Sequence, residues 1–112
     1  MIRETARKSE SAAIESPTGI FRTTLACNEQ LMLCHFRLKK GARIPFHGHA
    51  AAQNGYLISG KLRMLWESGK ELIAEPGSGW CFDPNVRHGA EVLEDSEAIE
   101  CFSPSRPEYI SQ

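Results

Sequence analysis

Short apolar runs broken by glycine, proline and serine constrain the fold of this chain more than any other feature. After residue 19 no helical spacing of apolar residues persists for long, and short runs between turn residues are typical of strands. We interpret residues 19–26 and 30–40 as the first two strands. One face of the second strand is apolar throughout and is expected to be buried: Met32, Cys34, Phe36 and Leu38. The pattern predicts a small, closed, all-β fold.

Later segments extend the same pattern. Residues 54–60 and 61–67 read as two strands joined in a hairpin at Ser59-Gly60, and residues 67–71 contain a second turn signal. Further short strands are expected between the remaining turn-rich segments, at residues 71–75, 79–82, 88–93 and 97–103.

The length and charge of the chain limit its class. A chain of 112 residues supports one core, and a net charge of −1 offers no basic field for nucleic acid. The first residues are polar and no segment has the apolar length of a signal peptide or membrane span, so we expect a cytoplasmic protein without a membrane partner. We expect residues 1–15 to be flexible or arm-like and residues 16–112 to form the barrel domain.

The four cysteines are scattered, without a CxxC pair, at positions 27, 34, 81 and 101. Most lie in apolar, strand-like runs. This distribution favours buried, reduced thiols over disulfides and argues against a structural zinc site.

Three of the four histidines form a pattern suited to a metal. His47 and His49 are two residues apart, so on a strand both side chains point to one face. Gln53 follows four residues later. Pro84 bends the chain before His88, which brings a third imidazole from another part of the sheet.

These residues resemble the two motifs of the cupin superfamily, in which a glycine, two histidines and a Glu or Gln precede a second glycine, and a later turn carries a proline and a histidine. The matching positions are Gly41, His47, His49, Gln53 and Gly60, then Gly77, Gly79, Pro84 and His88. The resemblance implies a single-domain cupin, a small antiparallel jelly-roll β-barrel with the ligands pointing into its mouth. It also implies a homodimer.

The end of the chain is similar to the pectin-degradation (KdgF-like) cupins, which carry a His, His, Gln, His metal site and a D-x-F-x-x-x-R motif. Here the motif positions are Glu100, Phe102 and Arg106, with Glu in place of Asp. The resemblance implies action on 4,5-unsaturated uronates, whose ring form is opened to the linear keto-deoxyuronate.

The same residues form a consistent site without the resemblance. Glu100 and Phe102 share strand parity, so both line the barrel if one does. Arg106 can hold a carboxylate through two parallel hydrogen bonds, or it can pair with Glu108. Arg43 has the parity of His47 and is a second candidate contact for an anionic, small-molecule substrate.

Gln53 affects the chemistry because it is neutral. Three imidazoles and an amide leave the charge of a divalent ion uncompensated, which favours Lewis-acid chemistry over redox cycling. The alternative is that Gln53 only hydrogen-bonds a ligand histidine. We expect one divalent transition metal ion per chain, and nickel, zinc, iron, manganese and copper all remain open.

The leading hypothesis is a metal-dependent isomerase- or lyase-type cupin in which Glu100 moves a proton, Arg106 holds the substrate carboxylate and Phe102 shapes the pocket. Glu100 could instead be an exposed strand residue within a run of acidic residues. Two other functions stay open: a cupin dioxygenase, and a non-catalytic module that binds a metal or a small acid.

Overall fold

Two long strands, β5 (Ala52–Trp66) and β8 (His88–Ser103), pair antiparallel along most of their length in the computed structural model, which describes residues 13–110. The other elements are β1 (Ile14–Glu15), β2 (Ile20–Cys27), β3 (Met32–Leu38), β4 (Arg43–His47), β6 (Glu71–Ala74), β7 (Gly79–Phe82) and the helical turn α1 (Pro107–Ile110). No helix in the described part of the chain is long and apolar enough to cross a membrane.

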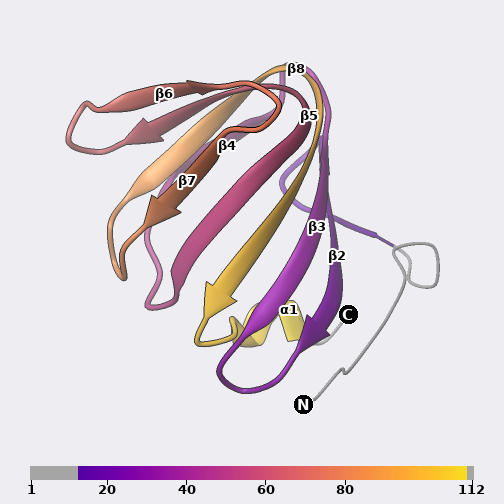
Figure 1. The fold of residues 1–112 in the computed structure, drawn as a ribbon, viewed down its shortest axis with the longest axis vertical. Helices are drawn as coiled ribbons and strands as arrows, with labels where there is room; N and C mark the ends of the chain where they lie inside the picture. The colour runs from indigo at the N-terminus through magenta and orange to yellow at the C-terminus, as the bar shows by residue number, and fades with distance from the viewer. Residues whose placement is uncertain (1–12, 111–112) are drawn as a thin grey trace.

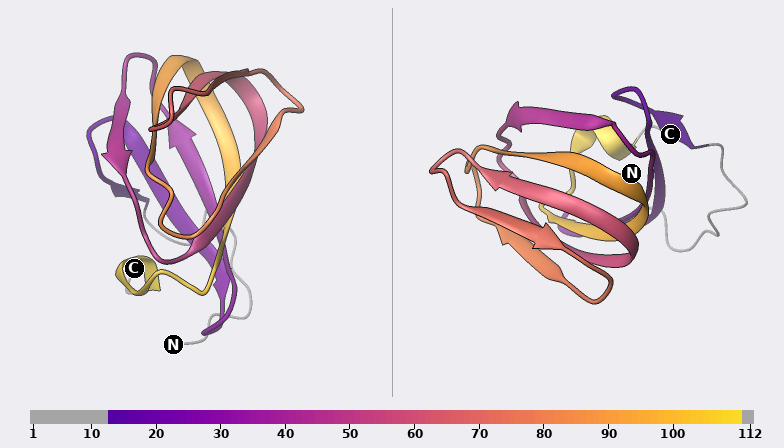
Figure 2. Two further views of the ribbon diagram at one scale, coloured as in Figure 1. Left: turned by 90° about the vertical axis from the view of Figure 1, so that its left-hand side faces the viewer. Right: turned by 90° about the horizontal axis from the view of Figure 1, so that it is seen from above.

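The described strands form one antiparallel sheet with the order β1-β2-β3-β8-β5-β6. β4 pairs with the first part of β8, and β7 pairs with the first part of β5. The sheet curves strongly, as Figures 1 and 2 show, so that its inner face encloses the core. The predicted all-β, antiparallel fold is confirmed.

Alternation along the strands places the core on the inner face. In β3 the four predicted apolar positions are all buried, whereas His35 and Arg37 face outward. The largest fully buried side chains come from strands across the whole sheet: Phe82, Phe102, Ile20, Met32, Leu57, Thr24 and Cys34. The predicted inner face of this strand is therefore correct.

The predicted hairpin at Ser59-Gly60 is wrong, because β5 continues through both residues as one strand. Gly60 has a φ of +94°, and the pairing of β5 with β8 shifts register at three points between Leu57 and Leu62. Across this irregular stretch Ser96 Oγ accepts a hydrogen bond from Lys61 N at 3.0 Å. The glycine therefore forms a bulge rather than a chain reversal.

The two strands predicted at residues 88–93 and 97–103 are one strand, β8. The polar residues between them are not a turn. Ser96 Oγ donates to Glu94 O at 2.7 Å, and the backbone keeps its partners on β5 at Lys61 and Ser59. Glu94 and Asp95 face solvent here, whereas Ser96 is buried.

The cysteines are free thiols, as predicted, but only two of them are buried. Cys27 and Cys34 lie in the core. Cys81 and Cys101 are exposed because both pair with Asn54 of β5 on the outer face of the sheet. Of the predicted arm, residues 1–12 lie outside the described residues, and Ile14–Glu15 pair with β2.

Candidate metal centre

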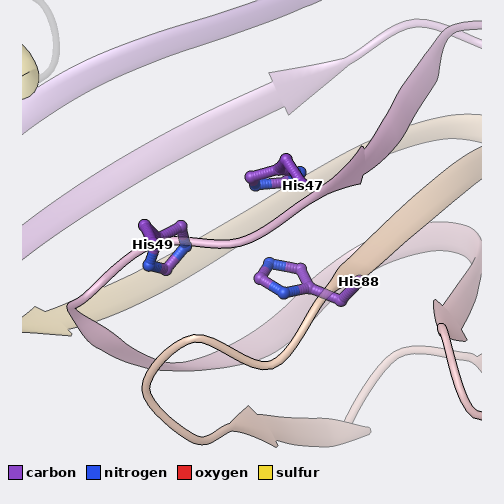
Figure 3. A group of neighbouring side chains, drawn as sticks. All are labelled: His47, His49 and His88. Carbon is purple, nitrogen blue, oxygen red and sulfur yellow. The ribbon is translucent and has the colours of Figure 1, made fainter.

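Three histidines converge at one end of the sheet interior. His47 lies at the end of β4, His49 in the loop that follows, and His88 at the start of β8 (Figure 3). One ring nitrogen from each lies within 4.8 Å of the others. The ring centroids of His47 and His88 are 4.5 Å apart, and His49 lies 5.6 and 5.3 Å from them. The histidines singled out from the sequence are therefore brought together.

Strand pairing produces this convergence. His47 and His88 are direct partners in the pairing of β4 with β8, after a register irregularity between Ile44 and His47. The loop carrying His49 is held by a hydrogen bond from Asn85 N to His49 O at 2.8 Å. Segments about 40 residues apart in sequence thus meet at fixed positions.

Each of the three imidazoles has one nitrogen engaged by the backbone. Nδ1 of His47, His49 and His88 lies 2.9, 2.7 and 2.9 Å from the carbonyl oxygens of Pro45, Ala51 and Val86. A carbonyl only accepts, so each Nδ1 carries the proton and each Nε2 presents a lone pair. In this tautomer Nε2 is the nitrogen that can bind a metal ion.

His88 gives the strongest indication that an ion fits. Its Nε2 is buried and has no hydrogen-bond partner among the described residues. Its ring stacks on Phe82, with centroids 3.9 Å apart and an interplanar angle of 8°. Burial lowers the pKa of His88 to about 4 and also lowers that of His49, so both imidazoles are neutral at pH 7. The donor set suits a divalent transition ion.

Gln53 lies beside the histidines, buried on β5. Its Oε1 is 2.9 Å from His49 Nε2, and its Nε2 donates a hydrogen bond to Glu100 Oε2. The oxygen therefore faces the histidine group and the nitrogen faces the acid. This orientation is compatible with a ligand role, while no carboxylate among the described residues joins the histidine group.

Glu100 occupies the middle of an inward-facing row across the sheet. Its strand partners are Cys34 on β3 and Gly55 on β5, and Gly55 pairs in turn with Trp80 on β7. Burial raises the pKa of the Glu100 carboxyl to about 8, although the Gln53 amide and the Arg106 guanidinium act in the opposite direction. A carboxyl in this range can give or take a proton near neutral pH.

Trp80 reaches this row because Gly55 has no side chain. A Cβ at Gly55 would lie 2.5 Å from the indole Nε1, too close for any other residue without a shift. The Trp80 side chain is buried, so the indole forms a fixed wall next to the acid.

Phe102 lies beside His49, and Arg106 lies beside Phe102. Phe102 is 2% exposed, and its ring centroid lies 5.9 Å from that of His49. The Arg106 Cζ is 5.3 Å from the Phe102 ring centroid. Arg106 also pairs with Glu108, so the alternative contact considered for this arginine is present.

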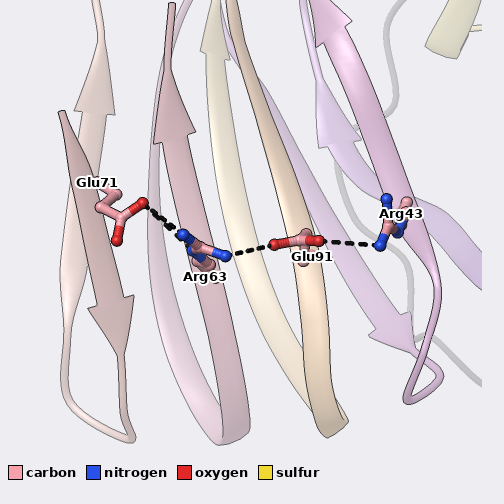
Figure 4. Close-up of polar contacts among 4 residues, drawn as sticks. All are labelled: Arg43, Arg63, Glu71 and Glu91. Atoms are coloured by element: carbon pink, nitrogen blue, oxygen red, sulfur yellow. Dashed lines mark hydrogen bonds and ion pairs between the residues drawn. The ribbon is translucent and has the colours of Figure 1, made fainter. Parts of the chain in front are cut away.

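Arg43 does not join the site. The irregularity between Ile44 and His47 breaks the alternation of β4, so Arg43 and His47 do not share a face. The Arg43 side chain is 77% exposed and pairs with Glu91 at 3.3 Å. Figure 4 shows it at the end of an outer-face ladder of ion pairs that runs from Glu71 through Arg63 to Glu91. The predicted substrate contact at Arg43 is wrong for this reason.

A cavity of about 70 Å³ connects these groups. Its polar side is lined by His47, Gln53, His88, Glu100, Arg106 and Tyr109, and aliphatic side chains such as Ile20, Leu62 and Val92 line the rest. Two imidazoles of the cluster, an acid and a cation thus line one cavity. Tyr109 was not predicted as a site residue, because it carries no local motif and only the fold places it in this cavity.

The chain belongs to the cupin family: the Cupin domain matches residues 34–103. The described fold agrees with this assignment, since the chain is a single small antiparallel cupin domain. The histidine cluster lies within the matched segment.

Solved structures resemble the chain over almost its whole length. The structure of KdgF from Halomonas sp. is 29% identical, with a TM-score of 0.87 over 95% of this chain and 99% of that one. An RmlC-like cupin from Shewanella frigidimarina NCIMB 400 is 24% identical, with a TM-score of 0.89 over 96% of each chain, which supports the fold.

Among curated proteins, oxalate decarboxylase OxdC from Bacillus subtilis (strain 168) is 33% identical over 75 residues. The match covers 63% of this chain and 20% of that protein, so the chain spans a fifth of the length of this relative.

Proposed function

We propose that this cupin is a metal-dependent enzyme that opens the ring form of 4,5-unsaturated uronates to linear keto-deoxyuronates. The observation that carries the proposal is the shared cavity, in which Glu100 lies beside Gln53 and the histidine cluster while Arg106 lies at its edge. The overall similarity to the Halomonas KdgF structure supports it.

The reaction is an isomerisation and needs no co-reactant. The C1–O5 bond of the cyclic hemiacetal breaks, the proton on O1 is lost as C1 becomes an aldehyde, and O5 becomes an enolate oxygen on C5. C4 then gains a proton and C5 becomes a ketone. One proton leaves oxygen and one arrives at carbon, so a single group that exchanges protons in both directions is sufficient.

Glu100 has the properties for this exchange. It faces the cavity, and its raised pKa keeps both protonation states accessible near pH 7. In our proposal it takes the proton from O1 and returns a proton to C4. The Gln53 amide holds the carboxylate in place through its hydrogen bond.

The other residues bind the substrate. Arg106 would hold the uronate carboxylate, since a guanidinium donates two parallel hydrogen bonds. Phe102 forms the wall between Arg106 and His49. His47, His49 and His88, with Gln53 Oε1 as the fourth donor, would hold one divalent ion, which supplies Lewis-acid polarisation of a substrate oxygen when bound.

Turnover of the substrate tests the proposal. The purified protein is incubated with unsaturated galacturonate freshly released by a lyase, and the ring-form signals are followed by NMR. We expect faster decay than in buffer, and Glu100→Gln should abolish the acceleration at unchanged metal content. Decay at the buffer rate with metal-loaded protein would refute this substrate.

The same samples separate the two other functions. A dioxygenase would consume oxygen when loaded with iron and given thiols or diketones, without ring opening of the uronate. A binding module would be stabilised against heat by metal or acid without turnover. The homodimer predicted from the sequence stays a prediction, which light scattering after size-exclusion chromatography would test.

A further inference from the structure

Arg106, which lines the cavity, is bonded to two neighbouring residues of the chain. Arg106 Nη2 donates to Glu108 Oε2 at 3.1 Å, and Nη1 donates to the Tyr109 hydroxyl at 2.8 Å. The Arg106 Nε is buried without a hydrogen-bond partner in the described part of the chain. Only 12% of the Arg106 side chain is exposed, so this guanidinium is enclosed and part of its donor capacity is unused.

Tyr109 is held firmly in this position. Its carbonyl accepts a hydrogen bond from Thr24 Oγ1 at 2.8 Å, which fixes α1 against β2. The guanidinium carbons of Arg22 and Arg106 lie 3.9 and 4.1 Å from the Tyr109 ring centroid. Because the hydroxyl oxygen accepts from Arg106, its proton remains available for donation to a ligand. Tyr109 lines the cavity next to Arg106.

Glu108 differs from Tyr109 in its freedom to move. Its side chain is 57% exposed, and its ion pair with Arg106 is at the surface end of the guanidinium. Such an exposed pair contributes little energy and can open at little cost. Glu108 pairs with Arg106 through a carboxylate, which is the same group through which an organic acid would bind.

We propose that Arg106 and the Tyr109 hydroxyl form a binding site for the carboxylate of the substrate, and that Glu108 fills this site in the absence of ligand as a competing carboxylate. A bound acid takes the place of Glu108 on Nη2, reaches the unused Nε and accepts a hydrogen bond from the Tyr109 hydroxyl. The identity of this acid as a uronate rests on the proposed function. The competition itself rests on the contacts of Arg106.

The competition predicts opposite effects at neighbouring residues. Glu108→Gln removes the internal carboxylate and should tighten binding of an acid about two- to fivefold, the range expected for an exposed ion pair. Tyr109→Phe removes one donor and should weaken binding about three- to tenfold. Tyr56→Phe is the matched control, because Tyr56 is 48% exposed on the outer face of β5.

Binding of a non-reacting acid provides the test. The full chain, metal-loaded, is titrated by NMR with saturated D-galacturonate and with neutral D-galactose. We expect Glu108→Gln to bind the acid more tightly than wild type, and Tyr109→Phe to bind it more weakly. Glu108→Gln should not change the affinity for the neutral sugar. Equal affinities of wild type and Glu108→Gln for the acid, equal effects on both sugars, or no binding of the acid to any variant would overturn the proposal. Glu108 is at the surface, so this variant keeps its fold even if Tyr109→Phe does not.

Kinetics distinguish this inference from the proposed function. With unsaturated galacturonate, Glu108→Gln should lower KM, and Tyr109→Phe should raise it, with smaller effects on kcat. If the variants bind galacturonate with the expected order of affinities but the unsaturated sugar is not consumed, the proposed reaction is refuted and the proposed acid site is supported. Turnover with unchanged KM in Glu108→Gln would refute the competition and leave the reaction intact.

Discussion

Gln53 donates a hydrogen bond from its side-chain amide to the carboxylate of Glu100, across the pairing of β5 with β8. The oxygen of the same amide lies 2.9 Å from His49 Nε2. A single neutral side chain therefore links the histidine cluster to the acid. An ionised carboxylate at this position could not donate the hydrogen bond to Glu100.

Gln53→Glu should lower turnover about 10- to 100-fold with metal content unchanged, because it removes the donor to Glu100 and places two carboxyls side by side. Steady-state kinetics and elemental analysis of the same preparation measure both quantities. Asn54→Asp, which adds the same charge on the exposed outer face, is the control and should behave as wild type. Full activity of Gln53→Glu would contradict this role.

The pKa of Glu100 predicts a pH-dependent stability. Its folded pKa, about 8, lies above the ordinary value of 4.5, so between these pH values the folded state binds more protons than the unfolded state. Stability is therefore lost as the pH rises from about 5 to 8. In metal-free protein, Glu100→Gln should gain on the order of 3 kcal/mol relative to wild type across this interval, because each pKa unit corresponds to about 1.4 kcal/mol. Urea unfolding at both pH values measures it, and a constant difference would refute the assignment.

The sequence predicts the site better than its surroundings. His47, His49, His88, Glu100 and Phe102 could be placed because motif spacing and strand alternation are local properties. The structure brings the three histidines into one cluster, and His47, His88, Glu100 and Phe102 line one cavity. Gln53 and Arg106 join them for the same reason.

The failures come from irregular backbone and from long-range contacts. The register irregularity between Ile44 and His47 places Arg43 on the face opposite to the predicted one. At Gly60, which has a positive φ, the strand continues where a hairpin was predicted. Alternation arguments cannot detect an extra residue in a strand. Tyr109 reaches the cavity only because Thr24, 85 positions earlier, holds it there.

The ladder of ion pairs on the outer face should support stability and not activity. Glu91 accepts from Arg63 at 3.1 Å and pairs with Arg43 at 3.3 Å, which links β5, β8 and β4 (Figure 4). Glu91→Gln should lower the free energy of unfolding by about 1 kcal/mol in dilute buffer, and by less in 1 M salt, since salt screens exposed pairs. Denaturant unfolding at the two salt concentrations checks this. A loss that is independent of salt would argue for a packing effect instead.

Metal content is the most direct test of the account. Protein purified without a histidine tag is analysed for metals as wild type, as His88→Ala and as His35→Ala, the last being the histidine that pairs with Glu97 outside the cavity. We expect about one divalent transition ion per chain in wild type and His35→Ala, and at least a tenfold loss in His88→Ala. Wild-type protein that carries almost no metal and binds none when it is supplied, or an equal loss in both variants, would contradict the metal centre.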